Sequence, residues 1–447
     1  MKVCEKVFRN YDIKGIYEKE LTTELAYYVG KAFGRIANNT VIIGHDSRES
    51  SNALNTNLIK GLTNSGIEVI DLGLVTMPMF CYARILLNIP YSIMITTDVL
   101  DNSYNGFKLF DKKGQMYGQK ISNILNIILN DDFIDGAGTI KPYDINLEYK
   151  NMLLKKIVLG PKKLKTVVSY INGTTKDFYS DIIKEWGVEV ISTQNFEKIK
   201  GSKQKKAEDL NLSIKQLASD VINNAADLGV LFDVNGNKIK IVDEKGIFVK
   251  PDMFMLIIWK SLYKVCKNKN ALFDVRCSNA LKESLEKLNL KPKFNKTESM
   301  YLKNIIKEKK YDFGGDYEGR FCFNDEFYGY DDSLYALGRL LKILSYSEFK
   351  VSDYLKNVPK YYSSNEEYII MKENKKDLII DKVKNYAKTK GYNYIDVDGI
   401  RIEYSDGFAL VRKSSNKNSI VVMFEGKTIE IMETYRLQIM KLINEEL

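Results

Sequence analysis

The sequence predicts an α/β protein built from several domains. Its 447 residues are more than a single compact core usually holds. Short β-branched runs ending in Gly, Asp or Thr alternate with amphipathic helices over most of the chain, as in sheets with helices on their faces. From about residue 361 the pattern changes to successive strands between two helices, which predicts a smaller α+β domain.

The first section shows the alternation clearly. Strands are predicted at 40–44, 68–72 and 91–95, with a helix at 51–65 between the first two. This order predicts a parallel or mixed sheet, in which the loops at the carboxyl ends of the strands form the ligand crevice. Residues 96–108 follow the third strand, and we expect them to form one of these loops.

The later sections repeat the pattern, and their similarity to the first is architectural only. In the second, strands are predicted at 165–170, 188–191 and 226–233, with a helix at 176–186. The third contains a strand at 271–275 and a turn at 314–316. The last contains a helix at 377–390, strands at 400–403, 408–412 and 420–425, and a helix from 428.

Composition excludes several classes of protein. The content of 45% hydrophobic and 28% charged residues is that of an ordinary globular protein. The net charge of +9 comes from scattered lysines without a nucleic-acid-reading motif, so a solvated surface is favoured over a nucleic-acid partner. No leader and no run long enough to span a membrane is recognised. Five widely spaced cysteines without a CxxC pair predict reduced, mostly buried thiols in a cytoplasmic protein.

Five short motifs occur in order from one end of the chain to the other. They are FRNYDIKG at 8–15, GHDSRESS at 44–51, DLG at 227–229, GGD at 314–316 and ALVR at 409–412. In order and spacing they resemble the α-D-phosphohexomutases, in the bacterial phosphomannomutase/phosphoglucomutase branch. The resemblance implies three α/β domains and a C-terminal α+β domain around a central cleft. The implied domains are 1–135, 136–246, 247–358 and 359–447.

The resemblance also implies an activity. In that family a phosphorylated serine transfers its phosphoryl group to a hexose phosphate, and the bisphosphate reorients and returns the other phosphate. Mg²⁺ held by three aspartates balances the charge. Separate loops hold the sugar hydroxyls and the phosphate that does not react. Because phosphoryl transfer depends mainly on positioning and charge neutralisation, each of these parts is important.

The nucleophile loop, at 95–108, departs from the family pattern. The serine position is Asp98 and the neighbouring histidine position is Val99. Two interpretations of Asp98 remain open. It could accept a phosphoryl group as an acyl phosphate, although its oxygen lies one atom further from the backbone than a serine oxygen. Alternatively, it imitates the negative charge of phosphoserine without reacting, which is the favoured interpretation.

Other groups near this loop are weaker candidates for catalysis. The hydroxyls of Thr97 and Ser103 lie close in sequence, but Thr97 should face away from Asp98 on an extended segment. His45 is the one histidine of the chain, and we expect it at a helix end or on the surface. Tyr11, Lys14 and Lys108 match positions near the family's catalytic site, with Lys14 in place of an arginine.

The metal turn, at 233–238, has lost charge. Its sequence DVNGNK keeps one carboxylate, Asp233, and has Asn235 and Asn237 where the family has aspartates. Each lost carboxylate removes about 4 kcal/mol of attraction per unit charge at 4 Å and an effective dielectric of 20, before solvation offsets it. We therefore expect Mg²⁺ to be weakly bound or absent. Asp233 could also be a turn residue that accepts backbone N–H groups.

The sugar turn, at 314–320, keeps its glycines and changes its polar residues. Asp316 replaces a glutamate, Glu318 a serine and Arg320 a histidine of the family. Pairing between Glu318 and Arg320 is slightly favoured over a role in binding hydroxyls.

The phosphate loop, at 412–418, is the best preserved of the four. Arg412 and Ser414 match phosphate ligands of the family, Asn416 is a further candidate for binding, and an arginine fork with hydroxyls and amides suits an anion. An exposed polar loop is an equally acceptable interpretation. The basic segment 196–206 is expected to be a solvated loop, with an acidic partner as the lesser alternative.

Because the losses are confined to reactive positions, the sequence predicts a phosphohexomutase-like protein with lost or severely weakened mutase activity. A phosphosugar-binding or partner-binding role would remain, with a hexose phosphate or a protein as the partner. The alternative is an active phosphomannomutase/phosphoglucomutase that uses Asp98 and Mg²⁺.

Overall fold

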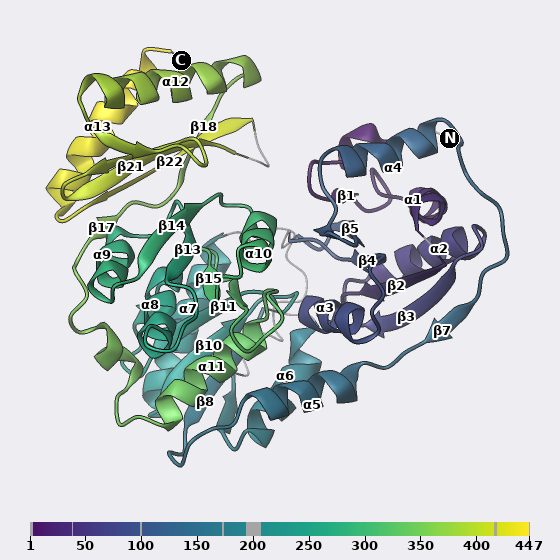
Figure 1. Ribbon diagram of the computed structural model, residues 1–447, viewed down its shortest axis with the longest axis horizontal. Helices are drawn as coiled ribbons and strands as arrows, with labels where there is room; N and C mark the ends of the chain where they lie inside the picture. The colour runs from purple at the N-terminus through teal and green to yellow at the C-terminus, as the bar shows by residue number, and fades with distance from the viewer. Residues whose placement is uncertain are drawn as a thin grey trace. The chain divides into compact units, whose positions relative to one another are not determined.

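The computed structural model describes residues 3–37, 39–98, 101–171, 174–193, 207–414 and 418–446. The chain divides into two compact units, each described here by itself. The first comprises residues 1–248 with 332–350, and the second residues 249–331 with 351–447. Four sheets are present in the described part of the chain, and their elements are labelled in Figure 1.

The N-terminal sheet of the first unit is mixed, as predicted. Its strand order is β1-β5-β4-β2-β3-β7, with β6 paired to β5. Strands β4, β2, β3 and β7 run parallel, and β5 is antiparallel to both β1 and β4. The elements are η1 (Glu5–Val7), β1 (Ile13–Ile16), α1 (Thr23–Ile36), β2 (Thr40–His45), α2 (Ser51–Thr63), β3 (Glu68–Leu74), α3 (Met77–Leu86), β4 (Ser92–Ile95), β5 (Tyr104–Asp111), β6 (Gly114–Gln115), α4 (Gln119–Leu129) and β7 (Ile140–Pro142).

One predicted loop is shorter than expected. Residues 96–108 were assigned to a single loop, but Tyr104–Asp111 forms strand β5 between β1 and β4. The strand forms because both of its edges find backbone partners. Gly106 is required there, since a Cβ would lie 2.5 Å from the carbonyl oxygen of Ile13 on β1. The strand carries Lys108 away from the loop and fixes its position.

The second sheet of the first unit has the order β12-β11-β10-β8-β9. Strand β8 is parallel to β9 and β10, and β11 is antiparallel to β10, so that the turn at 233–238 joins two neighbouring strands. The elements are α5 (Asn146–Lys156), β8 (Lys165–Tyr170), α6 (Thr175–Glu185), β9 (Glu189–Ser192), α7 (Ala207–Asn223), β10 (Leu228–Phe232), β11 (Ile239–Asp243), β12 (Phe248–Val249) and α11 (Ser333–Ser345). The basic segment 196–206 lies outside the described residues.

The second unit begins with a four-stranded sheet of order β14-β13-β15-β16. Strand β13 is parallel to both β14 and β15, and β16 returns antiparallel to β15. The turn at 314–320 joins β15 to β16. The elements are α8 (Pro251–Leu262), β13 (Asn270–Asp274), α9 (Asn279–Lys287), β14 (Lys291–Asn295), α10 (Ser299–Glu308), β15 (Phe313–Gly315), β16 (Phe321–Phe323) and η2 (Val351–Leu355).

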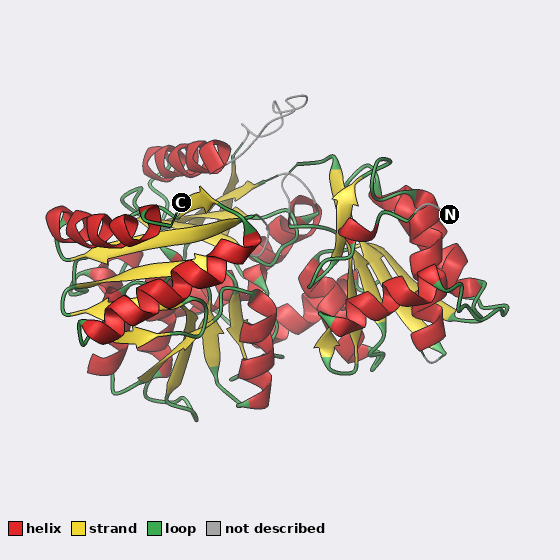
Figure 2. Ribbon diagram, turned by 90° about the horizontal axis from the view of Figure 1, so that it is seen from above, coloured by secondary structure: helices red, strands yellow, loops and turns green. Residues whose placement is uncertain are grey.

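The C-terminal section has strands between two helices, as predicted, and its sheet is antiparallel. The order is β17-β22-β21-β20-β19, with β18 paired to β22. Helices α12 and α13 cover one face of this sheet in Figure 1 and in Figure 2. The elements are β17 (Tyr362–Ser363), β18 (Glu367–Ile370), α12 (Glu373–Thr389), β19 (Asn393–Ile395), β20 (Ile400–Tyr404), β21 (Gly407–Lys413), β22 (Ser419–Gly426) and α13 (Ile429–Asn444).

The two sheets of the second unit share a small apolar core. Val275, after β13, packs with Phe408, Leu410 and Met423 from β21 and β22. No helix in the described ranges is long and apolar enough to cross a membrane. Cys81, Cys277 and Cys322 are buried, whereas Cys4 and Cys266 are partly exposed.

Candidate functional site

The turn after β2 holds the loop that follows β4. Asp46 accepts hydrogen bonds from the backbone N–H (3.1 Å) and Nε (3.2 Å) of Arg48. The buried guanidinium of Arg48 donates in turn to the carbonyl oxygens of Thr97, Asp101 and Tyr104 at 3.1–3.3 Å. One arginine therefore ties Thr97, Asp101 and Tyr104 to the turn after β2.

His45, at the end of β2, was expected at a helix end or on the surface, and this expectation is wrong. The side chain is 8% exposed, and Nδ1 lies 2.8 Å from the carbonyl oxygen of Asp46. It is buried because β2 lies inside the sheet, between β3 and β4.

Asp98 follows β4 and forms an ion pair with Lys108 on β5. Lys108 Nζ lies 3.1 Å from Asp98 Oδ1 and 3.0 Å from Oδ2. The lysine side chain is 8% exposed, whereas that of Asp98 is 34% exposed. A carboxylate that reaches solvent, with its charge balanced by a buried ammonium, therefore occupies the predicted nucleophile position. Val99 lies outside the described residues.

Lys14 lies on the same face of the sheet as Lys108. It is opposite Gly106 in the pairing of β1 with β5, and residues two apart on a strand share a face. Lys14 Nζ is 3.3 Å from Asp12 Oδ2. Tyr11 precedes this strand and is partly buried, and its carbonyl oxygen accepts a hydrogen bond of 3.0 Å from Gln115. Two lysines therefore lie on this face, each beside an aspartate.

The turn at 233–238 is joined to the loop after β4 through Asn235. The Oδ1 atom of Asn235 lies 2.9 Å from the hydroxyl of Thr96, which is also 2.8 Å from Asp46 Oδ2. Its Nδ2 lies 3.3 Å from the carbonyl oxygen of Thr97 and 3.4 Å from Asp98 Oδ1. The structure therefore brings the predicted nucleophile position and the predicted metal turn together.

Asp233 shapes this turn from within. Its Oδ1 accepts the backbone N–H groups of Asn237 and Lys238, each at 3.0 Å. Gly236 has φ 75°, and a Cβ there would lie 2.2 Å from the Tyr179 hydroxyl oxygen, so glycine is needed. These bonds agree with the alternative interpretation of Asp233 as a turn residue. The Oδ1 atom of Asn237 is buried, and no described residue forms a hydrogen bond with it.

In the second unit, Asp316 organises the turn between β15 and β16. Its Oδ1 accepts the backbone N–H groups of Glu318 and Arg320, each at 3.0 Å, and its Oδ2 accepts from Arg320 Nη1 at 2.9 Å. Arg320 therefore has Asp316 as an ion-pair partner, and the pairing of Glu318 with Arg320 stays a prediction. The turn, which has Gly319 at φ 93°, brings Arg320 back over Asp316.

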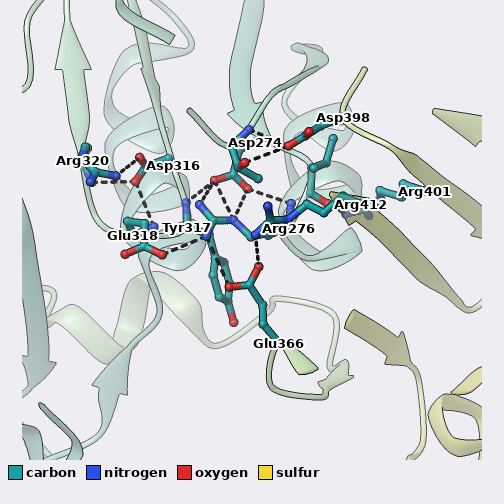
Figure 3. A network of polar contacts seen from close by, with 12 residues as sticks. Asp274, Arg276, Asp316, Tyr317, Glu318, Arg320, Glu366, Asp398, Arg401 and Arg412 are labelled. Atoms are coloured by element: carbon teal, nitrogen blue, oxygen red, sulfur yellow. Dashed lines mark hydrogen bonds and ion pairs between the residues drawn. The ribbon is translucent and has the colours of Figure 1, made fainter. Parts of the chain in front are cut away.

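A partner of Glu318 is Arg276, which follows β13. Figure 3 shows Arg276 with Asp274, Glu318 and Glu366 around it. Its Nη2 lies 2.6 Å from Asp274 Oδ2, and its Nη1 lies 2.9 Å from Glu318 Oε1 and 3.8 Å from Glu366 Oε2. Burial alone would lower the pKa of Arg276, but these three carboxylates raise it well above its usual value. Tyr317, whose pKa is raised by burial, lies below the guanidinium.

Arg412, at the end of β21, is bound to the protein's own carboxylate. Its Nη2 donates to Glu366 Oε1 at 2.6 Å, and its Nη1 donates to the carbonyl oxygen of Lys413 at 3.3 Å. The residue is 6% exposed, and its Nε has no hydrogen-bond partner among the described residues. Ser414 begins the following loop and donates its backbone N–H to Ser419. Asn416 lies outside the described residues.

Comparison with known proteins assigns the family. Residues 5–135 match the family model of the phosphoglucomutase/phosphomannomutase alpha/beta/alpha domain I, residues 250–362 that of domain III, and residues 366–442 that of the C-terminal domain. The phosphomannomutase/phosphoglucomutase of Pseudomonas syringae is 30% identical over 430 residues, which cover 95% of this chain and 92% of the relative. The chain belongs to the phosphoglucomutase/phosphomannomutase family.

Further similarities extend over the full length. The phosphoglucomutase of Neisseria meningitidis serogroup A is 29% identical over 453 residues, which cover 98% of this chain and 96% of the relative. The structure of a phosphoglucomutase/phosphomannomutase family protein from Burkholderia thailandensis matches with a TM-score of 0.89 and 26% identity, over 100% of this chain and 98% of that one. This chain therefore has the α/β phosphohexomutase fold with four domains, the last of them antiparallel. The predicted domain boundaries stay predictions.

A more distant structure contains a metal. The Aspergillus fumigatus N-acetylphosphoglucosamine mutase, in complex with GlcNAc-6P and magnesium, matches with a TM-score of 0.56 and 13% identity, over 90% of this chain and 82% of that one. At this identity the likeness concerns the fold alone. Magnesium must therefore be judged on the residues of this chain.

The residues of the metal turn, at 233–238, do not fit Mg²⁺ as a bound cofactor. Among the described residues no group of three or more His, Cys, Asp or Glu side chains could hold a metal ion. Asp233 Oδ1 already accepts hydrogen bonds from two backbone N–H groups, and Asn235 Oδ1 accepts one from the Thr96 hydroxyl. The oxygen of Asn237 is neutral, whereas Mg²⁺ is bound through carboxylates. We derive no catalytic step through a metal.

Sequence reasoning missed Arg276 and Glu366. A signal existed for Arg276, because the pattern Asp-x-Arg occurs at 46–48 and at 274–276, each time between a strand and a helix. The two turns share their hydrogen bonds, with the arginine N–H and Nε donating to the preceding aspartate. Glu366 belongs to no recognised motif, and only the fold places it beside Arg412.

Proposed function

We propose that this chain binds hexose phosphates and interconverts their 1- and 6-phosphates, with Asp98 as the phosphoryl acceptor. The observation that carries the proposal is the Asp98–Lys108 pair, a partly exposed carboxylate beside a buried ammonium at the end of a parallel strand. Full-length relatives named as phosphomannomutase and phosphoglucomutase support this alternative better than the predicted loss of activity.

The chemistry requires no group beyond those present and a sugar bisphosphate. An Asp98 carboxylate oxygen would attack the phosphorus of the bisphosphate, forming an acyl phosphate while the bond between phosphorus and the sugar oxygen breaks. The sugar oxygen takes up a proton from solvent water and leaves as a hydroxyl, and the hydroxide formed takes up a proton from the buffer. In the reverse direction the acyl phosphate transfers its phosphoryl group to a hexose phosphate. Lys108 and Lys14 would balance the charge on the transferred group.

A second candidate is binding without turnover. It is favoured by the same ion pair, because Asp98 already presents to Lys108 the negative charge that a phosphoserine would supply. The chain would then hold a hexose phosphate and pass its effect to a protein partner. The two candidates differ in one measurable respect, which is whether Asp98 becomes covalently phosphorylated.

A coupled mutase assay with purified protein decides between them. Glucose 1-phosphate and mannose 1-phosphate are offered with a sugar bisphosphate activator, with and without Mg²⁺. The Asp98→Asn variant tests the acceptor, and Asp101→Asn is the matched control, since Asp101 is an exposed aspartate of the same loop. We expect the wild type and the control to turn over and Asp98→Asn to be inactive. A phosphorylated form that hydroxylamine removes would identify an acyl phosphate.

The other results are equally informative. A wild type that is stabilised by hexose phosphate but never turns it over supports the second candidate. Equal activity in the wild type and Asp98→Asn contradicts the role of Asp98, because a contaminating mutase or another acceptor must then be responsible. If no hexose phosphate binds and none is converted, both candidates fail.

A further inference from the structure

Glu366 lies between two buried arginines of the second unit. Its Oε1 is 2.6 Å from Arg412 Nη2, and its Oε2 is 3.8 Å from Arg276 Nη1 (Figure 3). Arg412 comes from the end of β21 and Arg276 from the turn after β13. One carboxylate therefore contacts guanidinium groups from two different sheets.

The carboxylate supplies the charge that Arg412 needs in the absence of a ligand. Arg412 is 6% exposed, and a buried guanidinium without an anion is strongly unfavourable. Its other described hydrogen bond is to a neutral carbonyl oxygen, and its Nε is buried with no hydrogen-bond partner in the part of the chain that the structure describes. The donors of this arginine are therefore only partly satisfied by Glu366, which leaves a place for an anion with more acceptor oxygens.

The position of Glu366 in the chain allows its side chain to move away from Arg412. It is in the three-residue connection 364–366 between β17 and β18, outside the pairing of either strand with β22. Its side chain is 19% exposed, so it has access to solvent on one side. Rotation of this side chain away from Arg412 breaks no backbone pairing of the sheet.

We propose that Glu366 is an internal anion that occupies Arg412 until the phosphate group of a ligand replaces it. The proposal rests on the proposed function for the choice of a hexose phosphate, but any phosphate that reaches Arg412 would make the exchange. No covalent bond changes: one charge-assisted pair is broken and another is formed. A phosphate group near neutral pH carries −1.5 to −2 charges and three acceptor oxygens, and can therefore replace a carboxylate at a guanidinium.

The exchange has a cost that sets affinity. Every ligand must break the Glu366–Arg412 pair, so removing the carboxylate should strengthen phosphate binding. The opposite expectation follows if Glu366 only holds Arg412 in the correct orientation, since binding should then weaken without it. The sign of the change therefore distinguishes a competitor from a positioning residue.

The experiment compares Glu366→Gln with Glu367→Gln in the full chain. Glu367 is the adjacent residue, and its carboxylate pairs with Arg436, at 2.8 and 2.9 Å, and so provides a matched control. Binding of inorganic phosphate and of glucose 6-phosphate is measured by titration calorimetry. We expect Glu366→Gln to bind inorganic phosphate at least about tenfold more tightly than the wild type. The control should match the wild type within about twofold, and adding Arg412→Gln should remove the gain.

Equal or weaker phosphate binding by Glu366→Gln overturns the inference. If that variant does not fold, Glu366→Asp tests the same idea, because a side chain one methylene shorter holds the arginine less closely and should also strengthen binding. The proposed function fails separately. Stronger binding of inorganic phosphate, with no binding or conversion of glucose 6-phosphate, supports the exchange at Arg412 and contradicts the hexose phosphate as ligand.

Discussion

Replacing Arg401 with methionine should destabilise the second unit by several kcal/mol. Arg401, on β20, is fully buried, and its guanidinium carries four hydrogen bonds. Nη1 donates to the carbonyl oxygens of Val275 (2.6 Å) and Cys277 (2.7 Å), and Nη2 donates to Asn279 Oδ1 (2.6 Å). Nε donates to Glu403 Oε1 at 2.6 Å. The same group stacks 3.7 Å from the centre of the Phe408 ring.

The expected size of the effect follows from what remains after the substitution. Hydrogen bonds to charged groups contribute roughly 1.5–3 kcal/mol each, but four on one side chain are not additive. Breaking a buried ion pair by removing one partner costs about 3–5 kcal/mol, because the other charge stays buried. Glu403 keeps a hydrogen bond of 2.6 Å to Lys282, which reduces the cost of leaving its carboxylate buried without Arg401. We therefore expect a loss of about 4 kcal/mol.

The assay is urea unfolding of the full chain, with Arg436→Met as the control. Arg436 forms an ion pair with Glu367 but its side chain is 34% exposed, and exposed pairs contribute about 0.2–1 kcal/mol. Both variants remove a guanidinium group from the same domain. The expected difference of about 3 kcal/mol between their losses of unfolding free energy therefore reports the effect of burying that group. If the two variants lose equal stability, the reasoning about Arg401 is refuted. Loss of phosphate binding in Arg401→Met alone would show that Arg401 also fixes the turn that carries Arg276.

Two further predictions concern charge. Asn237→Asp places a carboxylate where a buried amide oxygen has no hydrogen-bond partner among the described residues. The substitution should raise Mg²⁺ affinity at least about tenfold over the wild type in titration calorimetry, and equal affinities would contradict the account of the metal turn. The pKa of Glu403 is raised by burial but lowered overall by Arg401 and Lys282, below its ordinary value of about 4.5. Its contribution to stability is therefore present above about pH 4.5 and is lost as pH falls through the lower folded value. Below about pH 4.5 the stability difference between wild type and Glu403→Gln should shrink in urea titrations, and a constant difference would contradict this.

Much of the fold could be predicted because local pattern and tertiary structure agree. The strand predicted at 165–170 is β8 without change, and the helix predicted at 51–65 is α2 at Ser51–Thr63. The exception is Tyr104–Lys108, which was assigned to a loop. It forms a strand because β1 and β4, from distant parts of the sequence, provide backbone partners on both edges. No local pattern records those partners.

The site could be predicted by position but not by partner. Asp98 and Asn235 were singled out separately, and only the fold shows their side chains 3.4 Å apart. Glu318 was expected to pair with Arg320, since the two are close in sequence. In the folded turn, Arg320 donates a hydrogen bond to Asp316. Glu318 accepts one from Arg276, a residue 42 positions earlier. Ion pairs depend on distances across the fold, which spacing along the chain does not determine.

The two candidate sites have one feature in common, which bears on whether the chain is active. In the first unit Asp98 forms an ion pair with Lys108, and in the second unit Glu366 forms an ion pair with Arg412. Lys108 and Arg412 are therefore each paired with a carboxylate of the protein. Under the proposed function, a phosphate group would have to replace that carboxylate, and its affinity would depend on how readily the carboxylate moves. Glu366 only has to move, whereas Asp98 must move or become phosphorylated. Under the proposed function, binding can persist in a chain whose turnover is lost, because turnover also requires that Asp98 accept the phosphoryl group.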